Sequence, residues 1–229
     1  MNKVGLAMLL FAALLSSVHT RPHNAWEQKY SHELEMITKG KELLKDGDVV
    51  LRLHNGPVSA IIRDFNRVDK SYSHAGVVLM EGGCPMVYHI MTSEDNRKGI
   101  IRKESFLQFC NPAENTAYGI YRYQLSRKEL AQEKIILQQW FEKRIAFDPL
   151  FDLQTDDRMY CSEMVAKLIA KTTQQRIIIK TTTTTSSEQR LFRATYHLPD
   201  SCAREGKVYS IDNLYLHSSC KCVMKFNFL

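Results

Sequence analysis

The fold of this chain is decided by the ten-residue stretch DDRMYCSEMV at residues 156–165. Its acidic turn is followed by apolar residues at helical spacing, so it predicts a helix from Cys161 to about Ala170. A helix N-terminus has free backbone N–H groups and a partial positive charge, which lower a thiol's pKa and can bind an oxyanion. The placement of Cys161 therefore indicates a reactive thiol, although the same stripe also suits a small buried apolar residue.

Residues 1–20 have the pattern of a secretory signal peptide. Lys3 precedes an almost wholly apolar run from residue 4 to residue 15, which gives way at once to polar residues. The run is short for a membrane-spanning helix, although an uncleaved anchor is the open alternative. We therefore expect an exported protein, periplasmic or extracellular, in which residues 21–229 form a single domain.

The chain of 229 residues has a formal net charge of +6, with its lysines and arginines spread along the sequence. Binding to nucleic acid normally requires a cluster of basic residues, and the sequence has no such cluster interleaved with aromatic residues. We therefore expect no nucleic-acid partner. A mildly basic exported protein suits an anionic envelope surface instead, and the composition specifies no oligomeric state.

Six cysteines follow the predicted signal peptide, at positions 84, 110, 161, 202, 220 and 222. Because an oxidising compartment permits disulfides, we predict a bridge from Cys202 to Cys220 or Cys222. A metal site at His217, Cys220 and Cys222 is a weaker alternative, since no second Cys or His pair accompanies them. No cofactor is predicted, because the sequence has no glycine-rich phosphate loop, no dinucleotide-binding fingerprint and no HExxH motif.

The hydrophobic pattern predicts an α+β fold, in which helices pack against a mostly antiparallel sheet. Alternating or β-prone residues predict strands at 49–53, 71–80, 86–91, 117–125, 208–211 and 222–228. Helical spacing predicts helices from 26 to 40 or 46, from 57 to 65, and from 126 to 148, the last opened by a capping box at Ser126 and Glu129. The polar tract at about 172–190, which contains Thr181 to Thr185, predicts an exposed insertion within the domain.

A thiol nucleophile needs a base, and histidine has the most suitable pKa for that role. Of the histidines that follow the predicted signal peptide, only His74 and His89 lie in predicted strands. Small residues flank His74, including Ala75 and Gly76, and we expect them to leave space above the sheet for a substrate. His74 is therefore the candidate base, with a hydrogen-bonded core histidine as the alternative.

The register of the predicted hairpin decides whether His89 can assist His74. A turn centred between Gly82 and Gly83 pairs residue 74 with residue 91, so His89 lies diagonally from His74, at about 7 Å between Cβ atoms. His89 would then hydrogen-bond the ring of His74 and fix its tautomer, as the third member of a triad does. A slip of one residue would place His89 on the opposite face.

Seven short motifs occur in a characteristic order: DGDVV (46–50), GPVS (56–59), SHAGVV (73–78), VYH (87–89), FD (147–148), YCSEMV (160–165) and IDNL (211–214). Over about residues 40–225, apart from the threonine-rich tract, this order resembles the permuted papain-like cysteine hydrolases, specifically the YiiX-like branch of the NlpC superfamily. The cysteine follows the histidine here, as the permutation requires, whereas ordinary papain-like enzymes have the reverse order.

The resemblance implies a thiol hydrolase with Cys161 as nucleophile and His74 as base. It implies cleavage of an amide or ester bond, in a cell-wall peptide or a lipid-type substrate, through an acyl-enzyme on Cys161. The second hairpin strand of this branch often carries Glu, whereas this chain has His89, which stabilises an imidazolium less than a carboxylate would. Two alternatives stay open: a lipid acyltransferase that uses the same intermediate, and an inactive binding module that keeps the cleft.

Overall fold

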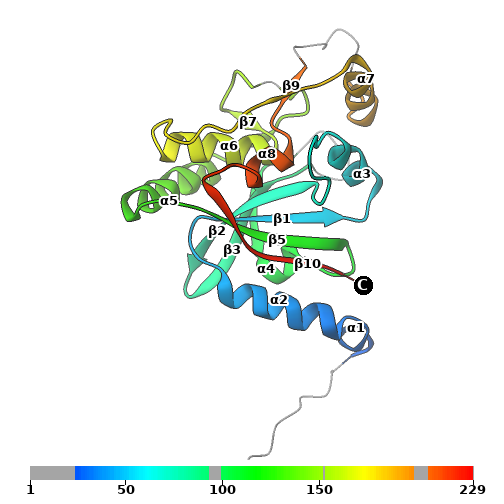
Figure 1. The fold of residues 1–229 in the computed structure, drawn as a ribbon, viewed down its shortest axis with the longest axis vertical. Helices are drawn as coiled ribbons and strands as arrows, with labels where there is room; N and C mark the ends of the chain where they lie inside the picture. The colour runs from blue at the N-terminus through cyan, green and yellow to red at the C-terminus, as the bar shows by residue number, and fades with distance from the viewer. Residues whose placement is uncertain (1–23, 93–98, 152, 199–205, 229) are drawn as a thin grey trace, which may run out of the picture.

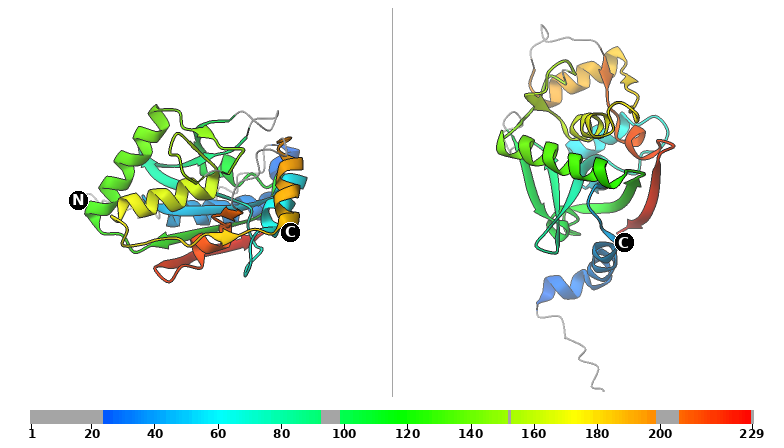
Figure 2. Two further views of the ribbon diagram at one scale, coloured as in Figure 1. Left: turned by 90° about the horizontal axis from the view of Figure 1, so that it is seen from above. Right: turned by 90° about the vertical axis from the view of Figure 1, so that its left-hand side faces the viewer.

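The computed structural model describes residues 24–92, 99–151, 153–198 and 206–228 (Figures 1 and 2). The predicted signal peptide and Cys202 lie outside these residues. Within them, an antiparallel sheet of six strands has the order β10-β5-β1-β2-β3-β4. Its strands are β1 (Asp48–His54), β2 (His74–Glu81), β3 (Cys84–Ile90), β4 (Ile101–Ser105), β5 (Asn115–Tyr123) and β10 (Cys220–Asn227).

Helices cover both faces of the sheet: α5 and α6 lie on one side, and α2 crosses the other (Figure 1). The helices are α1 (Ala25–Lys29), α2 (Ser31–Leu43), α3 (Pro57–Asp64), α4 (Phe106–Phe109), α5 (Arg127–Glu142), α6 (Cys161–Thr172), α7 (Ser186–Thr195) and α8 (Ile211–Tyr215). Two short strand pairs join β6 (Ala146–Phe147) to β7 (Arg158–Met159) and β8 (Thr182–Thr183) to β9 (Lys207–Val208). This arrangement confirms the predicted α+β class. None of the helices in the described residues has the length and hydrophobicity of a membrane span.

Strand β1 is buried on both faces, which explains its nearly continuous apolar sequence. Val49 and Leu51 belong to the core cluster beneath α5 and α6, whereas Val50 packs with Ile37 of α2. Successive side chains of a strand point to opposite faces, so one strand supports both layers. The middle of the sheet is therefore packed against helices on both faces.

The hairpin of β2 and β3 has the register that the sequence predicts. Val77 pairs with Tyr88 and Glu81 pairs with Cys84, so the turn is centred between Gly82 and Gly83. These two glycines have φ angles of +56° and +82°, a conformation that glycine adopts without a Cβ clash. The register therefore places residues 74 and 89 on the same face of the sheet.

Several predicted boundaries are wrong. The sequence gives no clear signal for β4 and α4, because the buried apolar residues within 101–109 do not follow a regular period. Helix α5 ends at Glu142 rather than at residue 148, because residues 146–147 pair with β7. The strand predicted at 208–211 is limited to Lys207–Val208, because α8 begins at Ile211.

The threonine-rich tract is exposed over more than half of residues 172–190, as predicted, but several of its side chains are buried. Ile177 is only 1 % exposed, and Thr182 and Thr184 are also buried, whereas Ile178 is 57 % exposed. Thr182 lies in β8, and its hydroxyl is 2.8 Å from the Ser210 hydroxyl. Strand pairing and side-chain contacts provide partners for the polar groups of Thr182 and Thr184, so these two threonines can be buried.

The small residues beside His74 do not leave open space for a substrate. A Cβ on Gly76 would lie 2.5 Å from Cγ1 of Val87 and 3.0 Å from the carbonyl oxygen of Tyr88. Strand β3 therefore occupies the space that the absence of a side chain creates. The expectation that this space serves a substrate is wrong, because the glycine permits close strand packing instead.

The variant Gly76→Ala should lower the free energy of unfolding by about 1–3 kcal/mol, the usual cost of an extra methyl group in a packed core. Urea denaturation followed by circular dichroism measures this change. The control is Val68→Ala, at a side chain that is 79 % exposed, where we expect a change within about 0.5 kcal/mol. Equal stabilities of Gly76→Ala and the wild type would contradict this packing.

Candidate active site

Cys161 is the first residue of α6, as the sequence predicts, and its two neighbours are held by one loop residue. The hydroxyl of Tyr160 accepts a hydrogen bond of 2.8 Å from the backbone N–H of Tyr209. The hydroxyl of Ser162 donates one of 2.7 Å to the carbonyl oxygen of Tyr209. Within the helix, the Glu163 carboxylate accepts a hydrogen bond from the backbone N–H of Tyr160. These contacts fix the start of α6, and with it the position of Cys161.

The structure brings the two predicted histidines together. Nε2 of His74, the first residue of β2, is 2.9 Å from Nδ1 of His89 in β3. The two rings meet edge to face, with an interplanar angle of 84°. This contact confirms the predicted adjacency, and it leaves Nδ1 of His74 as the nitrogen that can face a thiol.

A carboxylate that the sequence analysis missed lies on the far side of His89. Oε1 of Glu104, in β4, is 3.1 Å from Nε2 of His89, within ion-pair distance but without the alignment of an ideal hydrogen bond. It is also 3.6 Å from Nη1 of Arg52. Glu104 lies in β4, which had no periodic signal in the sequence. The pairing of β4 with β3 is what places it beside His89.

Cys161 and His74 line the same cavity, whose volume is about 270 Å³. Arg52 adds one charged group to its wall. Much of the remaining wall is apolar or aromatic and includes Val58, Ile62, Phe65, Ile90, Phe147, Phe151, Phe192, Tyr196, Val208 and Ile211. A concave apolar cavity with a few polar groups at one place is typical of a small-molecule site.

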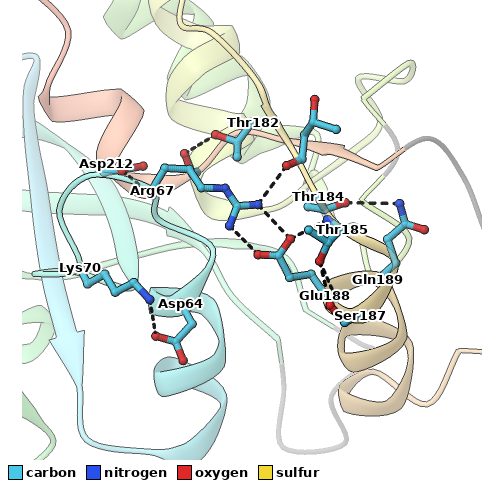
Figure 3. A network of polar contacts seen from close by, with 12 residues as sticks. Asp64, Arg67, Lys70, Thr182, Thr184, Thr185, Ser187, Glu188, Gln189 and Asp212 are labelled. Carbon is cyan, nitrogen blue, oxygen red and sulfur yellow. Dashed lines mark hydrogen bonds and ion pairs between the residues drawn. The ribbon is translucent and has the colours of Figure 1, made fainter.

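One wall of this cavity depends on the polar network in Figure 3, which joins the loop after α3 to α7. Nη1 of Arg67 is 2.5 Å from Oε1 of Glu188, and Nη2 donates to the carbonyl oxygen of Thr183. Between these elements, the rings of Phe65 and Phe192 stack at 3.9 Å between centroids, and both rings line the cavity. The threonine-rich tract therefore helps to build the site.

Burial determines the charge state of both candidate catalytic groups. It raises the pKa of the Cys161 thiol, although the backbone N–H groups of Ala75 and Ser162 act to lower that pKa. Burial, followed by the positive charge of Arg52, holds the pKa of His74 well below its ordinary value. The expectation of a thiol pKa lowered by the helix N-terminus is therefore wrong in net direction, because desolvation is the larger effect. The resting pair is a neutral thiol and a neutral imidazole.

The cysteines that the structure describes carry free thiols: Cys84, Cys110, Cys161, Cys220 and Cys222. The predicted bridge would require Cys202, which lies outside the described residues, while both of its proposed partners are free. No three His, Cys, Asp or Glu side chains in the described residues are grouped in a way that could hold a metal ion. His217, Cys220 and Cys222 therefore do not form the alternative metal site.

A strand histidine that precedes, in the sequence, a helix beginning with a cysteine, with both residues lining one cavity, is the arrangement expected of a permuted papain-like thiol hydrolase. The model of one family in this class, the permuted papain-like amidase enzymes of the YaeF/YiiX, C92 family, matches residues 43–211, which is more than half of the chain. The chain belongs to this family and is therefore a thiol hydrolase.

Among solved structures, the chain is similar to the crystal structure of the metalloprotein yiiX from Escherichia coli O157:H7. The TM-score is 0.62 at 20 % sequence identity, and the match covers 80 % of this chain and 97 % of that one. This likeness confirms the fold. A search of curated proteins finds no match.

The alkylation of Cys161 by iodoacetamide should accelerate with pH to beyond about 8.5, the pKa of an ordinary thiol. The raised pKa of Cys161 keeps the thiolate scarce at pH 7, so the reactive form accumulates only at higher pH. Mass spectrometry of the Cys161 peptide across pH 6–10 measures the rate, with the exposed Cys84 as an internal reference. A rate that becomes constant below pH 7 would contradict a raised pKa.

Proposed function

We propose that this protein is an exported thiol hydrolase that cleaves amides or esters with an apolar acyl group. The observation that carries the proposal is the apolar cavity that Cys161 and His74 both line. Because much of its wall consists of aliphatic and aromatic side chains, it suits a lipid-type acyl chain better than a polar cell-wall peptide. The signal pattern of residues 1–20 supports export to the periplasm or beyond the cell.

The charge states of the site favour a concerted first step. Nδ1 of His74 would accept the Cys161 proton while the sulfur attacks the carbonyl carbon, so no preformed thiolate is needed. The backbone N–H of Cys161 lies in the first turn of α6, where it has no partner within the helix and can donate to the oxyanion.

Collapse of the tetrahedral intermediate would then break the bond to the leaving group. The His74 imidazolium returns its proton to the departing amine or alcohol, and the acyl group stays on the Cys161 sulfur as a thioester. His74 next removes a proton from water, which attacks the thioester. The acid is released, and the thiol regains its proton.

The variants Cys161→Ala and His74→Ala should both lose hydrolysis of an acyl p-nitroanilide. For His74→Ala we expect kcat to fall by about 10²–10⁴-fold, the usual contribution of a general base. Release of p-nitroaniline measures the rate, and mass spectrometry of the wild type should detect an acyl group on Cys161. The matched control is Cys84→Ala, which removes an exposed thiol outside the cavity. Wild-type activity in Cys161→Ala would refute the nucleophile.

A series of acyl p-nitroanilides of increasing chain length tests the acyl preference. Each methylene that enters the cavity adds about 0.8 kcal/mol of binding, which corresponds to about a fourfold rise in kcat/KM. We expect this rise to continue until the cavity is full. A kcat/KM value that does not depend on chain length, or that is higher for a polar dipeptide anilide, would contradict a lipid-type substrate.

A further inference from the structure

We propose that Glu104 is a positioning residue that sets the tautomer of His74 through His89, so that Nδ1 of His74 keeps its lone pair for the Cys161 proton. The proposal rests on the proposed function, since it assumes that His74 is the base. Glu104 contacts His89, and His89 contacts His74, so one imidazole ring separates the carboxylate from the proposed base.

Three side chains on consecutive strands of the sheet, His74, His89 and Glu104, contact one another in series, and we call them the relay. His74 of β2 meets His89 of β3 through Nε2 and Nδ1, and the other nitrogen of His89 is 3.1 Å from Oε1 of Glu104 in β4. His89 is 0 % exposed, so these protein groups replace water at its ring. In the sheet, His89 pairs directly with Arg102, which places Glu104 diagonally across on the same face.

Glu104, at the end of the relay, is a hydrogen-bond acceptor because its carboxylate is ionised. Burial alone would raise the pKa of Glu104, but His89, Arg52 and Arg102 together hold it below its ordinary value. Arg52 is itself fixed, since it donates a 2.8 Å hydrogen bond to the Phe109 carbonyl oxygen and its guanidinium lies 4.5 Å from the centroid of the Phe109 ring. The buried Arg52 guanidinium thus adds to the effect of His89 in keeping the Glu104 carboxylate charged.

A lone pair on Nε2 of His89 would be repelled by the ionised carboxylate 3.1 Å away, so the nitrogen that faces Glu104 carries the proton. Burial lowers the pKa of His89 to about 4, so its ring is neutral and has only this one proton. Nδ1 of His89 is then an acceptor, and Nε2 of His74 must donate to it. The neutral ring of His74 has no second proton, which leaves the lone pair on Nδ1.

The relay also bears on the imidazolium that forms when His74 takes the thiol proton. A neutral imidazole stabilises that cation only as a hydrogen-bond acceptor. Glu104 adds a negative charge behind His89, while Arg52 and Arg102 oppose the cation. His89 thus connects the base to a carboxylate that lies on a different strand.

Replacement of Glu104 tests the relay, because Leu and Gln differ in whether they can accept a hydrogen bond. Glu104→Leu leaves the His89 N–H without an acceptor, so both tautomers of His74 become accessible. We expect kcat to fall by tenfold or more, up to the ~10²–10⁴-fold effect of a general base, with KM unchanged. Glu104→Gln keeps an acceptor oxygen without the charge, so it should restore most of the lost kcat.

The matched control is Glu81→Leu, which removes another carboxylate from the same sheet. Glu81 contacts Lys103 and Tyr88 and does not line the cavity. We expect this variant to keep the wild-type kcat. If Glu81→Leu lowers kcat as much as Glu104→Leu, the effect is general to the sheet, and the proposal is overturned.

Nitrogen NMR of ¹⁵N-histidine-labelled full-length protein reads the tautomers directly. The wild type should show protonated Nε2 and unprotonated Nδ1 in both His74 and His89, and Glu104→Leu should show a mixture in His74. Wild-type His74 protonated at Nδ1 would overturn the proposal, even if Glu104→Leu fails to fold. The predicted tautomers in a protein that hydrolyses no substrate would instead refute the proposed function and leave the relay intact.

Discussion

The register of the β2–β3 hairpin is the constraint on which the site depends. Two glycines at positive φ centre the turn between residues 82 and 83, and the ladder then places His74 and His89 on one face. A shift of one residue would turn His89 away and break the contact between the two rings. Because Gly76 lets β3 approach closely, the packing of the hairpin also resists such a shift.

Burial acts on this site in two opposing ways. It keeps the thiol and the imidazole neutral, which makes the resting enzyme less nucleophilic than a preformed ion pair would be. It also lowers the local dielectric constant, and this strengthens each electrostatic contact at the reacting atoms. The backbone N–H groups of Ala75 in β2 and Ser162 in α6 oppose the effect of burial on the Cys161 pKa, and the Glu104 carboxylate lies behind His89.

The site is also assembled from distant parts of the chain. Residue 209 anchors both neighbours of Cys161, and the Asp212 carboxylate accepts hydrogen bonds from the backbone N–H groups of Arg67 and Val68. Arg67 in turn holds Glu188 of α7. The aromatic wall between α3 and α7 therefore depends on polar contacts at its outer edge, which links the threonine-rich tract to the cavity.

Local signals in the sequence determined the α+β class, the helix that begins at Cys161, the glycine turn and the adjacency of His74 and His89. Each follows from spacing along a single helix or hairpin, where periods of 3.6 and 2 determine the neighbours. Glu104 and the aromatic wall could not be predicted in this way. The strand that carries Glu104 shows no clear period, and its partner on β3 is set by the pairing of β3 with β4. The direction of the Cys161 pKa shift was likewise decided by tertiary structure, because desolvation depends on how much of the fold surrounds the sulfur, and spacing along the chain does not specify that.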